Sequence, residues 1–218
     1  MLDFLKPFAD YLYLIPAIII SLTLHEFSHA WMAWRLGDPT PKNTGRLSLN
    51  PLRHIDVFGF IVMILVHFGW AKPVEINPMY FRNPRKGMMI TALAGPIMNL
   101  ILCVVSSLLM FFSYVFAWPA FIYQFLIYMV FLNVGLAVFN LIPVHPLDGS
   151  RVVSYFFPGY ANFMMRYGNY VQLGFVALLV LPEFLPIPDL VGSLISGVQS
   201  FAAGGLMRLW VALFGFLI

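Results

Sequence analysis

Residues 11–34 read YLYLIPAIIISLTLHEFSHAWMAW, an apolar run that contains two histidines and one glutamate. The run is long enough to cross a bilayer, which takes about 20 mostly apolar residues, and a Gly-Asp-Pro sequence at 37–39 ends it. Ionisable side chains inside such a helix are costly and mark a functional site by default. The sequence therefore predicts a first membrane span that carries His25, Glu26 and His29.

The composition of the whole chain also indicates a membrane protein. Hydrophobic residues make up 61% of the 218 residues and charged residues 10%, and the mean hydropathy is +0.87. Soluble domains have about 25% charged residues, so this chain has too few charges to cover a water-facing surface. We therefore exclude a soluble globular enzyme, a disordered protein and a nucleic-acid-binding module, since the net charge of +3 comes from few, scattered basic residues.

The pattern of apolar runs predicts an all-α polytopic membrane protein with five to six transmembrane helices. The apolar runs that can span a bilayer cover residues 11–34, 87–117, 120–142, 170–186 and 190–218. A shorter run at 57–70 is followed by prolines, which favours a membrane-embedded re-entrant or β-hairpin segment around 57–80. We expect a single membrane-embedded domain, 1–218, with its core at about 8–155 and two C-terminal helices at about 168–218.

The distribution of positive charge predicts the orientation of these helices, because basic residues near the ends of spans mark the cytoplasmic side. If the run at 57–70 dips into the membrane and returns, ten of the twelve Lys and Arg lie on one side, in segments 35–56, 71–86 and 143–168. We expect a multi-pass protein of the cell membrane with the N-terminus outside and the C-terminus in the cytoplasm. The candidate site would then open to the cytoplasmic side.

The sequence HEFSH at 25–29 has the spacing of a metal site. Residues i and i+4 share one face of a helix, so His25 and His29 can bind one metal ion together. Glu26 lies about 100° further round the helix, where it can act as a base on a water molecule at the metal. The alternative is a structural role, in which these polar side chains pair with one another inside the bundle.

A catalytic zinc ion usually takes three protein ligands and keeps one position for water. The candidates for the third ligand are Asp148, His145, His54, His67 and Glu75. The topology favours Asp148, because the run at 120–142 returns to the side on which the first span ends. Prolines before Asp148 require non-helical backbone, which at membrane depth must be buried in protein or line a wet cavity. Without the histidine pair, Asp148 would be interpreted as part of a helix-ending turn.

Three segments carry a family resemblance: HEFSH at 25–29, AGPIMN at 94–99 and NLIPVHPLDG at 140–149. In this order and setting they resemble the site-2 protease family of intramembrane zinc metalloproteases. The resemblance covers about residues 21–151. The chain is similar to the minimal branch of that family, which lacks PDZ and CBS domains.

The resemblance implies one zinc ion held by His25, His29 and Asp148. It also implies that zinc activates a water molecule and that Glu26 serves as the general base. The implied reaction is hydrolysis of a peptide bond in a transmembrane segment of a membrane-protein substrate, within the lipid bilayer and without nucleic acid as a partner. Asn140 resembles the family asparagine that holds the substrate backbone.

The remaining asparagine, histidine and cysteine candidates have other expected roles. Asn99 stands in the weaker segment at 94–99 and is expected to contribute to substrate binding. His145 stands where an apolar or aromatic residue is expected, and it is a candidate partner of a ligand or an alternative ligand. His54 and His67 are expected to be loop and interfacial histidines. The single cysteine, Cys103, is expected to pack within a helix.

Other functions fit the same residues. A membrane metal transporter would also place histidines and a carboxylate inside spans, but it would need further ionisable residues along a path, and the other spans have almost none. A metal-binding scaffold without proteolysis would not need Glu26. A zinc hydrolase with a non-protein substrate is a further alternative.

Overall fold

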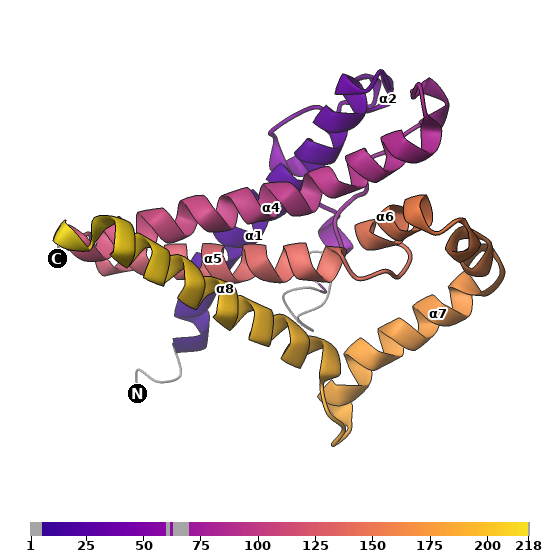
Figure 1. Cartoon of the computed structure of the whole chain (residues 1–218). Helices are drawn as coiled ribbons and strands as arrows, with labels where there is room; N and C mark the ends of the chain where they lie inside the picture. Colours follow the sequence, from indigo (N-terminus) through magenta and orange to yellow (C-terminus); the bar gives the residue numbers. More distant parts are fainter. Residues whose placement is uncertain (1–5, 60–61, 63–69, 218) are drawn as a thin grey trace.

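The computed structural model describes residues 6–59, 62 and 70–217, most of which are helical (Figure 1). The long helices are α1 (Lys6–Arg35), α4 (Pro84–Val115), α5 (Ala120–Asn140), α7 (Pro158–Phe184) and α8 (Leu190–Phe214). Shorter segments connect or end them: α2 (Thr40–Asn43), η2 (Pro51–Arg53), η3 (Pro78–Tyr80), α6 (Asp148–Phe156) and η4 (Gly215–Leu217). Within the described ranges no β-strand forms beyond one isolated bridge, which confirms the all-α class.

Four helices in the described part of the chain are long and apolar enough to cross a membrane. They are Asp10–Arg35 within α1, Pro84–Val115, Ala120–Asn140, and Leu190–Leu217, which combines α8 and η4. This confirms a polytopic membrane protein, whereas the count of five to six spans stays a prediction. α7 has 27 residues but is not among the four, because polar residues such as Arg166 and Gln172 interrupt its apolar sequence.

The predicted re-entrant segment at 57–70 lies mostly outside the described residues, so its course stays a prediction. Both of its ends are described. Ile55 and Ala71 form an antiparallel bridge, and the Lys72 amide donates a hydrogen bond to the His54 carbonyl at 2.8 Å. The two ends of this segment, at residues 54–55 and 71–72, therefore lie next to each other.

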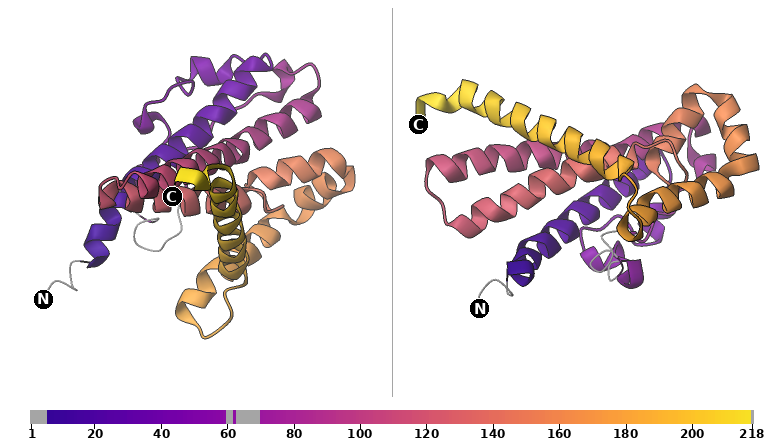
Figure 2. Two further views of the ribbon diagram at one scale, coloured as in Figure 1. Left: turned by 60° about the vertical axis from the view of Figure 1, so that its left-hand side comes forward. Right: turned by 90° about the horizontal axis from the view of Figure 1, so that it is seen from below.

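Helices α1, α4 and α5 pack against one another and form the core around the candidate site (Figure 2). Small side chains occupy many of the buried positions, including Ala30 and Ala33 of α1 and Ala92 and Ala94 of α4. Membrane helices approach closely through such residues, because lipid provides no hydrophobic drive for their association. The close approach brings polar groups of different helices within hydrogen-bonding distance.

Helix α8 covers the other side of α4 and α5. It packs on a buried cluster made of Cys103, Val130 and Val134, and the Trp210 indole N–H donates to the Ser107 hydroxyl at 2.9 Å. Cys103 is buried and free, in agreement with its expected packing role.

The two ends of the described chain lie at the same end of the bundle, beside the α4–α5 turn (Figure 2). Helix α8 ends there, since the ring of Phe214 lies against Phe111 and Phe112 of α4. Helix α7 leads away from α5 (Figure 1) and contains no buried residue. The side of the membrane on which each terminus lies stays a prediction.

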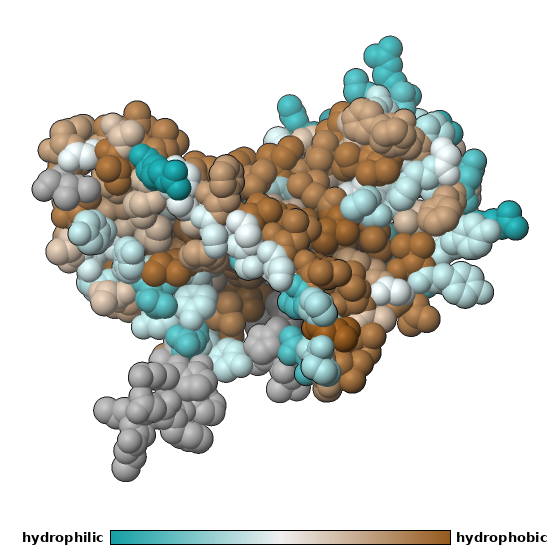
Figure 3. Space-filling view, turned by 60° about the horizontal axis from the view of Figure 1, so that its bottom comes forward, coloured by the Kyte–Doolittle hydropathy of each residue, from teal (hydrophilic) through white to brown (hydrophobic). Residues whose placement is uncertain are grey.

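The surface agrees with this arrangement. Apolar side chains cover much of the middle of the face drawn in Figure 3, and many hydrophilic ones gather at the end that carries α2, α6 and the start of α7. Many of the lysines and arginines belong to segments at this end. The candidate site lies toward the same end, where the first turn of α6 meets the second half of α1.

Candidate metal centre

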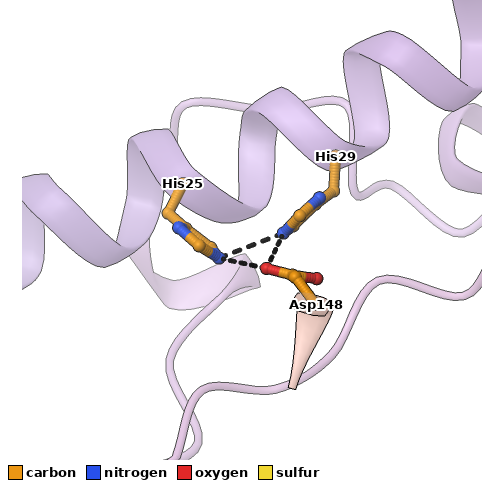
Figure 4. A group of neighbouring side chains, drawn as sticks. All are labelled: His25, His29 and Asp148. Atoms are coloured by element: carbon orange, nitrogen blue, oxygen red, sulfur yellow. Dashed lines mark hydrogen bonds and ion pairs between the residues drawn. The ribbon is translucent and has the colours of Figure 1, made fainter. Parts of the chain in front are cut away.

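His25 and His29 lie one turn apart on α1, and their imidazoles point to the same side of the helix (Figure 4). Their Nε2 atoms are 3.0 Å apart. Both residues are buried, with 4% and 6% of their surface exposed. The four-residue spacing therefore produces the shared face that the sequence predicts.

Asp148 reaches the histidines from a distant part of the chain. Helix α5 ends at Asn140, and Pro143 and Pro146 keep the following loop from continuing the helix. Helix α6 begins at Asp148, whose side chain turns back toward α1 (Figure 4). Its Oδ2 atom lies 3.3 Å from Nε2 of His25 and 3.2 Å from Nε2 of His29.

Gly149 permits this approach of α6 to the loop. A Cβ atom at this position would lie 2.7 Å from the carbonyl oxygen of Ile142 and would overlap the carbonyl of Leu141. Both obstacles are backbone atoms that cannot rotate away. A larger residue would therefore push Asp148 away from the histidines.

The proton positions on His29 follow from its second ring nitrogen. Nδ1 of His29 lies 2.7 Å from the carbonyl oxygen of Thr91 on α4. A carbonyl oxygen only accepts hydrogen bonds, so Nδ1 carries the proton and Nε2 presents a lone pair.

A longer chain of hydrogen bonds orients His25. Nδ1 of His25 lies 2.5 Å from Oδ1 of Asn99, and Nδ2 of Asn99 donates to Oδ1 of Asn133 at 2.8 Å. Nδ2 of Asn133 donates to the Met129 carbonyl and to the Ser21 hydroxyl, both at 2.8 Å. Because the Met129 carbonyl only accepts, it determines the orientation of both carboxamides. His25 must then donate through Nδ1, and its Nε2 also presents a lone pair.

Two imidazole lone pairs therefore face the carboxylate of Asp148. Its Oδ2 atom is buried and has no hydrogen-bond partner among the described residues. The ligand atoms of the three residues lie within 4.8 Å of one another. Two neutral imidazoles and a carboxylate are a ligand set of catalytic zinc sites, so these residues fit a zinc ion.

Gly95 of α4 leaves room for an ion at this point. A Cβ atom at Gly95 would lie 2.6 Å from Nε2 of His25 and would overlap Nε2 of His29. The AGPIMN segment therefore supplies space through Gly95 and a hydrogen-bond acceptor through Asn99.

A cavity of about 110 Å³ lies beside the three candidate ligands. This volume is room for a few water molecules, each of which takes roughly 30 Å³ in the liquid. Its other lining residues include Glu26, Asn140, Pro146 and Arg151, together with Pro73, Val74 and Ile76 from the chain that follows the bridge. Glu26 and the candidate ligands thus border one small, mainly polar space.

The structure places the remaining candidates elsewhere. His54 is buried and its Nε2 donates to the Ser48 carbonyl at 2.6 Å, while His145 and Glu75 are exposed. None of these three belongs to the group of metal-ligating side chains found among the described residues, and His67 lies outside those residues.

Asn99 lies in a different environment from the one its expected role requires. It is fully buried, and both ends of its carboxamide are used within the protein. In this structure Asn99 therefore orients His25 and does not face the cavity.

Sequence reasoning did not identify several residues of the site. The role of Thr91 depends on its backbone carbonyl, which no side-chain pattern reveals. Asn133 is a polar residue inside an apolar run and could have been noticed for that reason. Arg151 follows Asp148 by three residues, which places it on the same face of α6.

Comparison with known proteins agrees with this geometry. The family model described as "Peptidase family M50" matches residues 13–121 and 115–182, which together cover most of the chain. The chain belongs to peptidase family M50. This is the site-2 protease family that the three segments resemble, and the chain is accordingly a zinc metalloprotease of family M50.

Two relatives illustrate the extent of the similarity. The chain is 37% identical over 177 residues to "Putative zinc metalloprotease YwhC" of Bacillus subtilis (strain 168), a match that covers 78% of this chain and 81% of the relative. It is 35% identical over 147 residues to "Putative zinc metalloprotease Rip2" of Mycolicibacterium smegmatis, a match that covers 64% of this chain and 55% of the relative. No solved structure matches the chain.

The space at Gly95 leads to a first prediction. Gly95→Ala should strongly reduce the zinc bound per chain, because the added methyl group occupies the space beside both Nε2 atoms. Metal analysis of the purified protein measures this. Alanine favours a helix by about 1 kcal/mol over glycine, so weakened helix formation would not explain the loss.

Gly205→Ala is the matched control, since an added Cβ there meets no atom within 4 Å. It should retain the zinc content of the wild type. Undiminished zinc in Gly95→Ala would show that this space does not hold the ion.

The chain of carboxamides leads to a second prediction. Asn133→Leu should fold but bind zinc roughly ten- to a hundred-fold more weakly, as expected when a partner of a metal-ligating histidine is lost. Titration against a competing chelator gives the affinity. Asn162→Leu, at an exposed position of α7, is the control, and equal affinities in the two variants would contradict the role of Asn133.

Proposed function

We propose that this metalloprotease is an intramembrane endopeptidase that hydrolyses a peptide bond within a transmembrane segment of a membrane protein. The proposal is carried by one observation: His25, His29 and Asp148 converge beside a polar cavity that also contains Glu26. Two of the three residues belong to a helix that is long and apolar enough to span the bilayer. A substrate held in the same bilayer can reach this depth.

We assign the zinc ion, one per chain, to His25, His29 and Asp148. When bound, zinc would polarise the scissile carbonyl and lower the pKa of a water molecule toward about 7. The chain holds both imidazoles with Nε2 unprotonated, through the hydrogen bonds made by Nδ1.

Glu26 acts as the general base in this proposal. Its carboxylate accepts a proton from the water molecule in the cavity and passes that proton to the leaving amine. The support is its position, since Glu26 is half-buried and borders the same cavity as the candidate ligands. A metal site with a purely structural role would have no use for this carboxylate.

Asn140 and the segment at 73–76 are proposed to hold the substrate backbone. Asn140 borders the cavity and donates through Nδ2 to the Leu136 carbonyl at 3.0 Å, which leaves its side-chain oxygen to accept from a peptide N–H. Pro73, Val74 and Ile76 border the cavity in chain that forms no helix. A substrate that unwinds locally exposes its peptide groups and can pair with such a segment.

We further propose that the end of the bundle that carries the site faces the cytoplasm. The support is the concentration of Lys and Arg in the segments that join the helices at this end. The N-terminus would then lie outside, and the protein would be a multi-pass protein of the cell membrane.

Glu26→Gln tests the proposed base. The variant should retain zinc but lose almost all cleavage of single-span peptides, because glutamine cannot accept the proton. Glu183→Gln, at an exposed position of α7, should cleave like the wild type. Appreciable cleavage by Glu26→Gln would reject the assignment, and ion flux in proteoliposomes without proteolysis would favour a transporter.

His29→Ala tests the ligand set. Loss of one of three ligands should remove both zinc and activity, and a zinc chelator should have the same effect on the wild type. His145→Ala provides the control, since His145 is exposed and lies outside the ligand group. Metal analysis that finds equal zinc in the two variants would rule out His29 as a ligand.

A further inference from the structure

A second cavity, of about 330 Å³, lies beside the metal cavity. It is formed where the start of α4, η3 and α6 meet, and its lining includes Pro84, Arg85, Met88, Arg151 and Tyr155. The space is larger than the metal cavity and has a mostly apolar wall. It can therefore accept a bulky apolar side chain, which the metal cavity cannot.

The two cavities share one lining residue and are bordered by neighbouring residues of one stretch of chain. Arg151 borders both of them. Pro73, Val74 and Ile76 border the metal cavity, and Pro78 borders the second one. A peptide extended along residues 73–78 would pass from the metal site into the second cavity. At about 3.3 Å per residue, it would reach the second cavity roughly four or five residues from the cleaved bond.

The charges around the second cavity are of one sign. Arg85 and Arg151 line it, and no acidic residue does. In the part of the chain that the structure describes, the ion pairs link only Asp148 with the two histidines. Two guanidinium groups at the border of an apolar space favour a carboxylate there, since arginine pairs with carboxylates through parallel hydrogen bonds.

We propose that this cavity is a substrate subsite that takes an apolar side chain next to an acidic one. The inference rests on the proposed endopeptidase function and adds a preference that the function does not itself require. Substrates would carry an aspartate or glutamate on the cytoplasmic flank of the cleaved bond, a few residues away from it. Arg85 and Arg151 bind that carboxylate, and the apolar neighbour fills the space between α4 and α6.

Arg85 allows the subsite to be tested without disturbing the metal cavity, because it borders only the second cavity. Arg151 borders both cavities. A substitution of Arg151 would therefore mix an effect on the metal cavity with an effect on the subsite. Arg82 is the matched control: it is exposed, lies three residues earlier in the same segment and borders neither cavity.

The experiment uses single-span peptides in vesicles whose fraction of anionic lipid is constant within each series of peptides and differs between series. Mass spectrometry first locates the bond that the wild type cleaves, and one residue of the cytoplasmic flank is then changed in turn to Glu, Gln or Lys. At one position, the wild type should cleave the Glu peptide roughly five-fold more efficiently than the Gln peptide, an effect of the size expected for a partly exposed ion pair. Arg85→Glu should reverse the order and prefer the Lys peptide, whereas Arg82→Glu should retain the wild-type order.

Other outcomes would overturn the inference. A wild type that cleaves all peptides with equal efficiency has no such subsite, and equal shifts in Arg85→Glu and Arg82→Glu would indicate only a general field effect. A loss in Arg85→Glu that follows the fraction of anionic lipid, and not the charge of the peptide, would assign the cavity to a lipid headgroup. In each of these cases the wild type would still cleave peptides in the presence of zinc, and Glu26→Gln would not. Failure of the subsite is therefore distinguishable from failure of the proposed function.

Discussion

The centre of this protein is an electrostatic constraint between three buried side chains. Two imidazole nitrogens that carry lone pairs stand 3.0 Å apart and face a carboxylate oxygen 3.2–3.3 Å away. Without a cation these groups repel one another, and burial prevents water from screening the repulsion. A divalent ion turns the same arrangement into an attractive one. The surrounding structure holds the two imidazoles and the carboxylate of Asp148 close to one another.

The other helices supply this support mainly through backbone groups and carboxamides. Thr91 of α4 and Met129 of α5 contribute carbonyl oxygens, and Asn99 and Asn133 transmit the constraint from Met129 to His25. In an apolar medium each of these groups needs a partner, because an unpaired polar group there costs several kcal/mol. The hydrogen bonds therefore stabilise the packing of α1, α4 and α5 while they orient the ligands. In this way the same interactions serve the membrane fold and the site.

The reaction also needs water and an accessible peptide bond inside a largely apolar protein. The structure meets this need at one end of the bundle, where residues 73–78 run past the metal cavity and the beginning of α6. Asp38 helps to hold this segment, because its buried carboxylate accepts from the backbone amides of Thr40 and Asn77 at 2.9 and 2.7 Å. In the proposed reaction, this segment can align a substrate that has lost its helical hydrogen bonds. The candidate ligands, Glu26 and the residues Pro73, Val74 and Ile76 border one polar cavity at this end of the bundle.

Much of this could be predicted from local patterns. The apolar runs predict helices because backbone polar groups in lipid must pair within a helix, and the spacing of His25 and His29 places them on one face because the helix has 3.6 residues per turn. The order of the spans favoured Asp148 as the third ligand, and the family resemblance implied it. Whether residues 170–186 also span the membrane stays a prediction, because an apolar sequence indicates that a helix can enter the membrane but not that it does so.

The sequence by itself therefore determined the membrane class and the helices of the core, since these depend on composition and periodicity. It also predicted the two-histidine, one-carboxylate set, through the spacing of the histidines, the order of the spans and the family resemblance. Only the tertiary structure decided how these parts act on one another. It showed that Asn99 orients His25, that Gly95 provides the space beside the ligands, and that α8 ends beside the α4–α5 turn. These features depend on contacts between residues 34 to more than 100 positions apart, and such contacts arise from how the helices pack and not from any local pattern.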